Sequence, residues 1–262
     1  MALSGVKTLG FGLALVILAG SGCTSLRYKK TEDLWSESDQ KFKAGQYADT
    51  VPYYDELLRR DENDQNARFH RAVAKDESGA TTDALDDYQK CSDSGNAKAL
   101  LWKANLDIKS GFFDAAEKDL QSLRGASLDS HEQVAQFTLI GTLRLKQGNP
   151  KLAVQTLEKA CDLARGQSDS FTLKHARDAH YNAAFGYYQL GDFATGCEHM
   201  EQYRNISESS GAGLDGNDYA MLCLLHYMNG DMEGARQYLS KADPGWRAKA
   251  AKTFEDPAFF GG

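Results

Sequence analysis

Residues 181–200 read YNAAFGYYQLGDFATGCEHM, and the glycine at their centre, Gly191, occupies a position that recurs along the chain. A small residue, Ala184, stands seven positions before this glycine, while Gly196 and the bulky Met200 stand five and nine positions after it. The same arrangement surrounds five further glycines: Gly45, Gly79, Gly111, Gly148 and Gly230. A pattern that returns every 32 to 43 residues is typical of a repeat protein.

The repeated positions have a simple explanation in helix packing. Glycine adopts the left-handed conformation that ends a helix without a clash of a Cβ atom. Small residues on either side allow two helices to approach closely, and a bulky residue fills the remaining groove. The residues seven before each glycine are Ser38, Ala72, Ala104, Gly141, Ala184 and Cys223. The residues nine after it are Tyr54, Tyr88, Leu120, Leu157, Met200 and Leu239. The pattern therefore predicts six helical hairpins.

This pattern resembles the tetratricopeptide repeat, a helix–turn–helix unit of about 34 residues. The residues that carry the resemblance are Ala72, Gly79, Ala84 and Tyr88 in the second repeat and Ala184, Gly191 and Phe193 in the fifth. The chain departs from the family in lacking its early tryptophan and its closing proline. The resemblance implies an all-α fold, an α-solenoid of about six such repeats over residues 32–243. It also implies a concave wall, formed by the first helix of each repeat, along which partners bind.

Residues 1–22 resemble the signal peptide of a bacterial lipoprotein. Lys7 precedes an apolar run from Leu9 to Ala19 that is too short to span a membrane, and small residues then lead to Cys23. The resemblance implies cleavage before Cys23, attachment of palmitate-type acyl chains to it, and a tether over residues 23–31. Thr24, at the position after the cysteine, resembles the sorting signal of lipoproteins that are anchored in the outer membrane and face the periplasm. The alternative is an ordinary signal peptide in which Cys23 has no role.

The net charge of the chain argues against one class of partner, nucleic acids. The chain carries 30 Lys and Arg against 37 Asp and Glu, a net charge of −7. Nucleic-acid binding needs a basic stripe, so this composition argues against it.

Four cysteines follow Cys23: Cys91, Cys161, Cys197 and Cys223. They stand at or near helix-packing positions, so we expect free, buried cysteines that behave as small hydrophobic residues. The alternative, in an oxidising compartment, is a disulfide between Cys197 and Cys223.

Helical spacing before each glycine predicts which side chains face the concave wall. The fifth and sixth repeats place five large residues there, and earlier repeats add three candidates. The predicted partner-binding residues are Tyr181, Phe185, Tyr188, Leu224, Tyr227, Phe69, Leu101 and Asn105. Aromatic residues often dominate interface energies, which favours a protein partner. The alternative is that several of them only pack the superhelix, and that Tyr187 rather than Tyr188 points inward.

Some members of this family hold a peptide carboxylate between lysines, an arginine and asparagines. Here Lys98, Asn105 and Lys109 fall on one predicted inner helix, and no flanking repeat completes the set. We therefore expect the groove to favour an apolar segment, extended or helical.

Motifs of catalysis and metal binding are absent from the sequence. His175 and His180 are five residues apart, and Cys197 and His199 are two apart, so neither pair shares a helix face. We expect no enzyme, no cofactor and no metal site.

An undetected enzyme is the alternative to a binding protein. It would need the titratable groups of the predicted inner wall, Asp76, Glu77, Lys98 and Lys109, to converge in one pocket.

Residues 244–262 are predicted to cap the last repeat. Asp243 and Pro244 signal the start of a short helix. Trp246, Ala250 and Phe254 share one face of it, as a cap for a solenoid requires. The tail at residues 257–260 either docks on this cap or serves as a recognition tag.

The function predicted from these features is that of a lipid-tethered adaptor that binds a protein partner in the periplasm. Proteins of similar layout act in the assembly of outer-membrane machinery such as type IV pilus secretins and β-barrel proteins. The alternatives are an accessory protein that recruits cell-wall enzymes, and the undetected enzyme.

Overall fold

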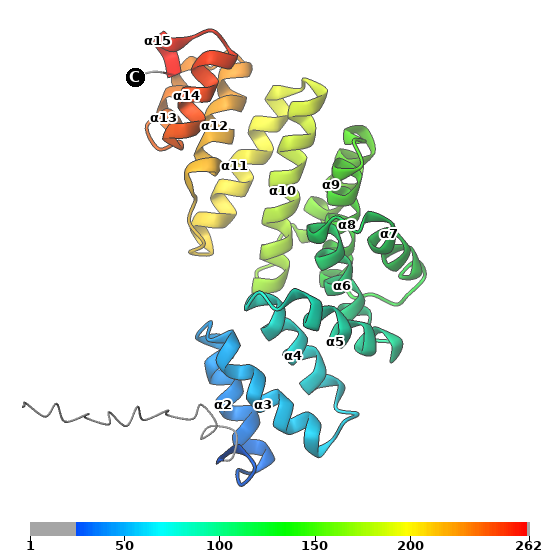
Figure 1. Cartoon of the computed structure of the whole chain (residues 1–262). Coiled ribbons are helices and arrows are strands. Elements are labelled where there is room, and N and C mark those ends of the chain that lie inside the picture. The colour runs from blue at the N-terminus through cyan, green and yellow to red at the C-terminus, as the bar shows by residue number, and fades with distance from the viewer. Residues whose placement is uncertain (1–24, 261–262) are drawn as a thin grey trace, which may run out of the picture. The chain divides into compact units, whose positions relative to one another are not determined.

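The computed structural model describes residues 25–260, and all regular elements in this range are α-helices (Figure 1). The chain divides into two compact units, one ending at Asp87 and the other beginning at Tyr88. The predicted signal peptide, residues 1–22, and the predicted lipidation site, Cys23, lie outside the described residues. Between residues 25 and 260, no helix combines the length and apolar character needed to cross a membrane.

The first unit is built from antiparallel hairpins. Its helices are α2 (Thr31–Lys43), α3 (Tyr47–Arg60), α4 (Gln65–Glu77) and the first part of α5 (Thr81–Asp93). Within this unit α3 packs against both α2 and α4, so that consecutive helices lie side by side (Figure 1).

The second unit continues the alternation of helices. Its paired helices are α6 (Ala97–Ser110) with α7 (Phe113–Ser122), α8 (Ser130–Lys146) with α9 (Pro150–Ala164), α10 (Ser170–Leu190) with α11 (Phe193–Ser209), and α12 (Gly216–Met228) with α13 (Met232–Leu239). Two short helices follow, α14 (Pro244–Thr253) and α15 (Pro257–Phe260). Helix α8 packs against both α6 and α10, as first helices of stacked repeats do.

The recurring glycine ends the first helix of each hairpin, as the sequence predicts. Gly111 closes α6 with φ 83° and Gly191 closes α10 with φ 78°, both in the left-handed region. The glycines at the other four repeated positions also have positive φ. The prediction of an all-α fold made of six glycine-linked hairpins is confirmed.

The small and bulky residues of the pattern belong to the interior of the fold. All six small residues before the glycine and all six bulky residues after it are buried. A Cβ atom placed on Gly141 of α8 would overlap the side chain of Leu157 on α9, which is fully buried. The absence of a side chain at this position therefore allows α8 and α9 to approach closely.

The C-terminal segment covers one end of the second unit. The side chain of Asp243 accepts a hydrogen bond from the amide of Trp246, which fixes the start of α14. Ala250 is buried, and Trp246 and Phe254 pack on the same cluster as the last two helical hairpins. Phe260 is only 1% exposed, so the apolar tail docks on the cap.

The four cysteines of the described chain are free and buried. Burial raises the pKa of the thiol of Cys223 to about 12, so this residue is an unreactive packing residue. The structure therefore favours the interpretation of packing cysteines over a bridge between Cys197 and Cys223.

The chain joins the first unit earlier than the sequence suggested. Leu26 is buried in the core of this unit with Leu34 and Tyr54. The guanidinium of Arg60 donates to the carbonyl oxygens of Leu26, at 3.1 Å, and Lys29, at 2.8 Å. The described residues of the predicted tether, from 25 on, are thus held against the first hairpin.

The carboxylate of Glu56 holds this arrangement in place. It accepts hydrogen bonds from Arg59, at 2.7 Å, and from Arg60, at 2.8 Å, although its side chain is only 7% exposed. The hydrogen bonds from Arg59, with those from Arg60, lower the pKa of Glu56 to about 2 against the opposing effect of burial. Arg60 therefore links the buried carboxylate to the N-terminal carbonyls.

We expect Glu56→Gln to lower the free energy of unfolding by on the order of 1 kcal/mol near neutral pH, because the three charge-assisted hydrogen bonds from Arg59 and Arg60 are weakened. Since the pKa of Glu56 is lowered on folding, to about 2, its contribution is complete above the unfolded pKa and is lost as the pH falls through the folded pKa. Urea unfolding of both chains, followed by circular dichroism at several pH values, should show their difference shrinking below about pH 4. The matched control is Glu32→Gln, at an exposed position of α2. A difference that does not change with pH would contradict this assignment.

Candidate binding groove

A hollow of about 560 Å³ lies in the second unit, within the range of known ligand sites. We call it the groove. Its lining comes mainly from three first helices, α6, α8 and α10, with contributions from α11 and α12. The residues that line it are Leu101, Trp102, Asn105, Ile108, Lys109, Thr138, Leu139, Thr142, Lys146, Phe171, Lys174, His175, Asp178, Tyr181, Asn182, Tyr203 and Asp218.

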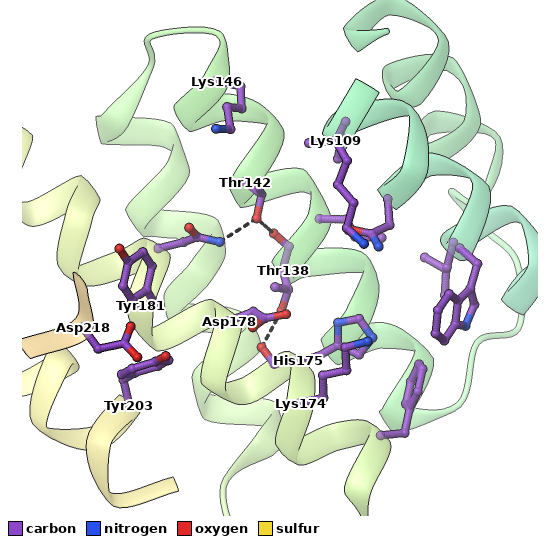
Figure 2. A pocket seen from close by; sticks show the side chains of 17 residues that line it. Lys109, Thr138, Thr142, Lys146, Lys174, His175, Asp178, Tyr181, Tyr203 and Asp218 are labelled. Atoms are coloured by element: carbon purple, nitrogen blue, oxygen red, sulfur yellow. Dashed lines mark hydrogen bonds between the residues drawn. The ribbon is translucent and has the colours of Figure 1, made fainter. Parts of the chain in front are cut away.

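Three lysines from three helices line the groove: Lys109 of α6, Lys146 of α8 and Lys174 of α10 (Figure 2). Lys109 and Lys146 form no ion pair or hydrogen bond with the residues that the structure describes. Figure 2 shows Lys109 reaching from α6 towards Thr138 of α8. The groove therefore offers two ammonium groups to an anionic ligand.

A network of hydrogen bonds fixes the walls formed by α8 and α10. The amide of Asn182 donates to the hydroxyl of Thr142 at 2.9 Å, and that hydroxyl donates to the carbonyl oxygen of Thr138 at 2.8 Å. The hydroxyl of Thr138 in turn lies 3.3 Å from the carbonyl oxygen of His175 (Figure 2). The two helices are thus joined by polar contacts at the base of the groove.

The opposite end of the groove carries two tyrosines and the carboxylate of Asp218. The rings of Tyr181 and Tyr203 meet at 5.3 Å, edge to face, with Asp218 beside them (Figure 2). Burial and the neighbouring Asp218 raise the pKa of Tyr203. Desolvation raises the pKa of Asp178, which lies nearer the middle of the groove, beside Thr138 (Figure 2). The end of the groove with Tyr181, Tyr203 and Asp218 thus offers acceptor oxygens to a hydrogen-bond donor or a cation.

The apolar part of the lining lies between α6 and the start of α10. The ammonium of Lys174 lies 5.1 Å from the ring of Trp102, and that of Lys98 lies 5.0 Å from the ring of Phe171. These cation–π contacts cross between the two helices in both directions. Burial lowers the pKa of His175 to about 4, so this imidazole is neutral.

The expected distribution of charge needs a correction. The sequence suggested Lys98, Asn105 and Lys109 as an isolated polar set, but Lys98 does not line the groove. Lys146 and Lys174 come from two neighbouring repeats and lie in the same hollow as Asn105 and Lys109. The groove is therefore not simply apolar, because side chains of successive helices converge there.

The structure brings together three of the eight predicted partner-binding residues. Leu101, Asn105 and Tyr181 line the groove. The role of these residues in binding stays a prediction.

The other five predicted residues lie elsewhere. Phe69 belongs to the first unit, where its ring meets that of His70 at 6.0 Å. Phe185 packs on a core cluster around Leu157, and Leu224 is half-buried on α12 without lining the groove.

The two remaining tyrosines pack against other aromatic residues. Tyr188 meets Phe193 at 5.9 Å. Tyr227 lies within 5.8 Å of the rings of Phe254, Phe259 and Phe260, and its hydroxyl donates to Asp256 at 3.1 Å. Tyr187, the alternative to Tyr188, points its hydroxyl at Glu158, 2.7 Å away. No continuous aromatic patch of the predicted kind lines the groove.

The helical spacing also predicts part of the lining beyond the eight predicted partner-binding residues. Thr138, Thr142 and Lys146 stand ten, six and two residues before Gly148, on the predicted inner face. Lys174 and His175 had no such signal, because α10 is 21 residues long and extends beyond the repeat pattern.

The groups considered for catalysis do not form one site within either unit. Asp76 and Glu77 belong to the first unit, whereas Lys98 and Lys109 belong to the second. A separate cluster of potential metal ligands, Cys161, His180 and His199, lies in another hollow of the second unit. Sequence reasoning missed this cluster, because its members come from three different helices.

Comparisons with known proteins agree with the class that the fold defines, a helical-repeat protein. Residues 37–97 match a tetratricopeptide-repeat family model. No curated protein matches the chain. The match identifies tetratricopeptide repeats within residues 37–97.

Solved structures of similar fold include PilF of Pseudomonas aeruginosa, 16% identical with a TM-score of 0.64 over 91% of this chain and 96% of that chain. PilW, described as a widely conserved type IV pilus biogenesis factor, is 13% identical with a TM-score of 0.65 over 86% of this chain and 94% of that one. MamA of Desulfovibrio magneticus is 18% identical with a TM-score of 0.52 over 68% of this chain and 96% of that one. At these identities the likeness concerns the fold.

We expect Tyr227→Ala and Tyr181→Ala to differ in their effect on stability. Tyr227 is half-buried and contacts three rings of the C-terminal segment, so its truncation should cost about 3 kcal/mol of unfolding free energy. Tyr181 faces the groove, and its truncation should cost about 1 kcal/mol. Urea unfolding followed by circular dichroism measures both values. An equal or larger loss for Tyr181→Ala would mean that this ring is a packing residue.

Proposed function

We propose that this chain is a membrane-tethered adaptor that binds a protein partner in the periplasm through the groove. The observation that carries the proposal is the groove itself, in which side chains of three successive first helices converge. Its polar walls are fixed by the hydrogen bonds between Asn182, Thr142 and Thr138. A surface that is already ordered loses little conformational entropy when it binds a partner.

The chemistry of the lining suggests the kind of segment that binds. Leu101, Ile108 and Phe171 offer apolar contacts, while Lys109 and Lys146 offer charge to a carboxylate. An extended peptide with apolar side chains and an acidic group complements this surface. We propose such a segment as the ligand.

The proposed partner belongs to the assembly of outer-membrane machinery, such as a type IV pilus secretin or a β-barrel protein. Supporting this choice, PilW, whose fold is similar, is described as a type IV pilus biogenesis factor. A cell-wall hydrolase is the alternative partner, and identification of the bound protein distinguishes the two. The proposal assigns no catalytic role to the chain.

The proposed anchor is a lipid on Cys23, which would hold the chain at the outer membrane. The fold begins close to this residue, because Leu26 is already buried in the first unit. Two residues separate Cys23 from Leu26, and at about 3.3–3.6 Å per residue the first hairpin would lie near the bilayer surface.

We expect the double substitution Lys109→Glu and Lys146→Glu to weaken partner binding about tenfold or more, because two attractive charges become repulsive. The measurement is photocrosslinking in cells from a reactive residue at position 105, with mass spectrometry of the captured protein. The matched control is Lys118→Glu with Lys151→Glu, two exposed lysines outside the groove that give the same change in net charge.

Capture that survives the groove substitution, or that falls equally in the control, would contradict binding through the groove. Helical content measured by circular dichroism must be the same in all chains, so that a loss of capture reports binding rather than unfolding.

We expect Cys23→Ser to release the chain from the membrane fraction, because it removes the attachment point of the proposed acyl chains. The intact chain should incorporate labelled palmitate and partition into a detergent phase, and the variant should do neither. Cys223→Ser, at a buried cysteine of α12, is the matched control and should keep the label. An unlabelled intact chain would favour the ordinary signal peptide.

A further inference from the structure

Three side chains from three successive helices converge in a second hollow of the second unit. Cys161 of α9, His180 of α10 and His199 of α11 each place one ligand atom within 4.8 Å of the others. The Nδ1 atoms of His180 and His199 are 3.0 Å apart. Cys161 and His199 are each only 8% exposed. We propose that these three residues bind a Zn²⁺ ion.

The distances suit this ion. With bonds of about 2.0–2.1 Å to nitrogen and 2.3 Å to sulfur, a tetrahedral Zn²⁺ site separates its ligand atoms by about 3.3–3.6 Å. The two imidazole nitrogens are already close to that spacing. All three ligand atoms lie within 4.8 Å of one another, so reaching the tetrahedral spacing needs a movement of at most about 1 Å, which is within the reach of side-chain rotation.

The surroundings of His199 orient its ring for coordination. Its Nε2 atom lies 2.9 Å from the carboxylate of Glu158, which also accepts a hydrogen bond from the hydroxyl of Tyr187 at 2.7 Å. The ring of Tyr187 stacks on the imidazole of His199 with centroids 5.4 Å apart. A carboxylate behind a histidine is the usual partner of a zinc ligand, because it fixes the tautomer and turns the other nitrogen towards the metal.

The protonation states follow from this geometry. If Nε2 of His199 donates to Glu158, its Nδ1 carries a lone pair and accepts the proton of His180 Nδ1. Metal binding would move the proton of His180 to its Nε2 atom and release the thiol proton of Cys161 to solvent.

The protein supplies three ligands, which leaves the fourth position of the ion to a water molecule. The hollow around the cluster has a volume of about 940 Å³, so there is room for that water. The ion would join α9, α10 and α11. This inference does not depend on the proposed adaptor function.

The test is a titration of the whole chain, purified without an affinity tag in a reducing buffer, with Co²⁺ as a spectroscopic probe. We expect one equivalent to bind with the absorption of tetrahedral cobalt and a thiolate-to-metal charge-transfer band, and Zn²⁺ to displace it. Cys161→Ser and His199→Gln should abolish saturable binding. Glu158→Gln should weaken it about 10-fold or more, as expected for a group behind a ligand.

The matched control is Cys223→Ser, which removes a buried cysteine that lies outside the cluster and should leave binding unchanged. X-ray absorption of the zinc-loaded native chain tests the site without any substitution, and it should show one sulfur and two imidazole nitrogens bound to the ion. No saturable binding by the native chain, a coordination shell without sulfur, or unchanged binding in Cys161→Ser would overturn the proposal.

Discussion

The close approach of two helices beside a left-handed glycine is the contact on which the rest of the structure depends. At Gly141 the neighbouring helix leaves no room for a Cβ atom, and the buried Leu157 occupies that space. A Cβ atom on Gly186 of α10 would likewise meet Val154 of α9 at 2.6 Å. Two glycines thus hold α8 and α10 against the same helix. Helices α8 and α10 also carry much of the lining of the groove, so the spacing of its walls depends on how closely both helices pack against α9.

Helix α10 has more than one role because its faces meet different neighbours. Asp178 and Tyr181 face the groove, while His180, between them in the sequence, meets His199 of α11. A helix of 3.6 residues per turn separates such neighbours by about 100°. Substitutions on the groove face of α10 should therefore leave the contact of His180 with His199 in place, provided that the small residues in contact with α9 are kept.

The sequence contains enough local information for the fold but not for all of the site. The positions of Gly191, Ala184 and Met200 are set by contacts within one hairpin, and they recur, so a single chain reveals them. Tyr227 fits the same helical spacing as Tyr181, yet the C-terminal Phe259 and Phe260 cover it. No repeat pattern contains this contact, because the tail occurs once in the chain.

The cluster of Cys161, His180 and His199 illustrates a second limit. Successive members are 19 residues apart, one on each helix, whereas familiar metal motifs place two ligands within one turn or loop. The packing of three helices brings these residues together, and the local spacing of residues in the sequence does not predict that packing. A search of the sequence for paired ligands therefore misses the cluster.

The surroundings of the groove strengthen the electrostatic effect of its charged side chains. Elsewhere in the second unit, Lys103 is neutralised by Asp107 and Asp119, and Arg204 by Glu201 and Glu208. The chain has an excess of carboxylates, with a net charge of −7. Water screens the charge of an unpaired lysine on a convex surface. Beside a hollow, the surrounding helices exclude part of the solvent, so the electric field of the ammonium groups is focused into the hollow. The lysines lie on α6, α8 and α10, while Asp218 lies with the tyrosines at the other end. This separation of charge would give a bound segment a preferred direction, with its acidic group towards Lys109 and Lys146.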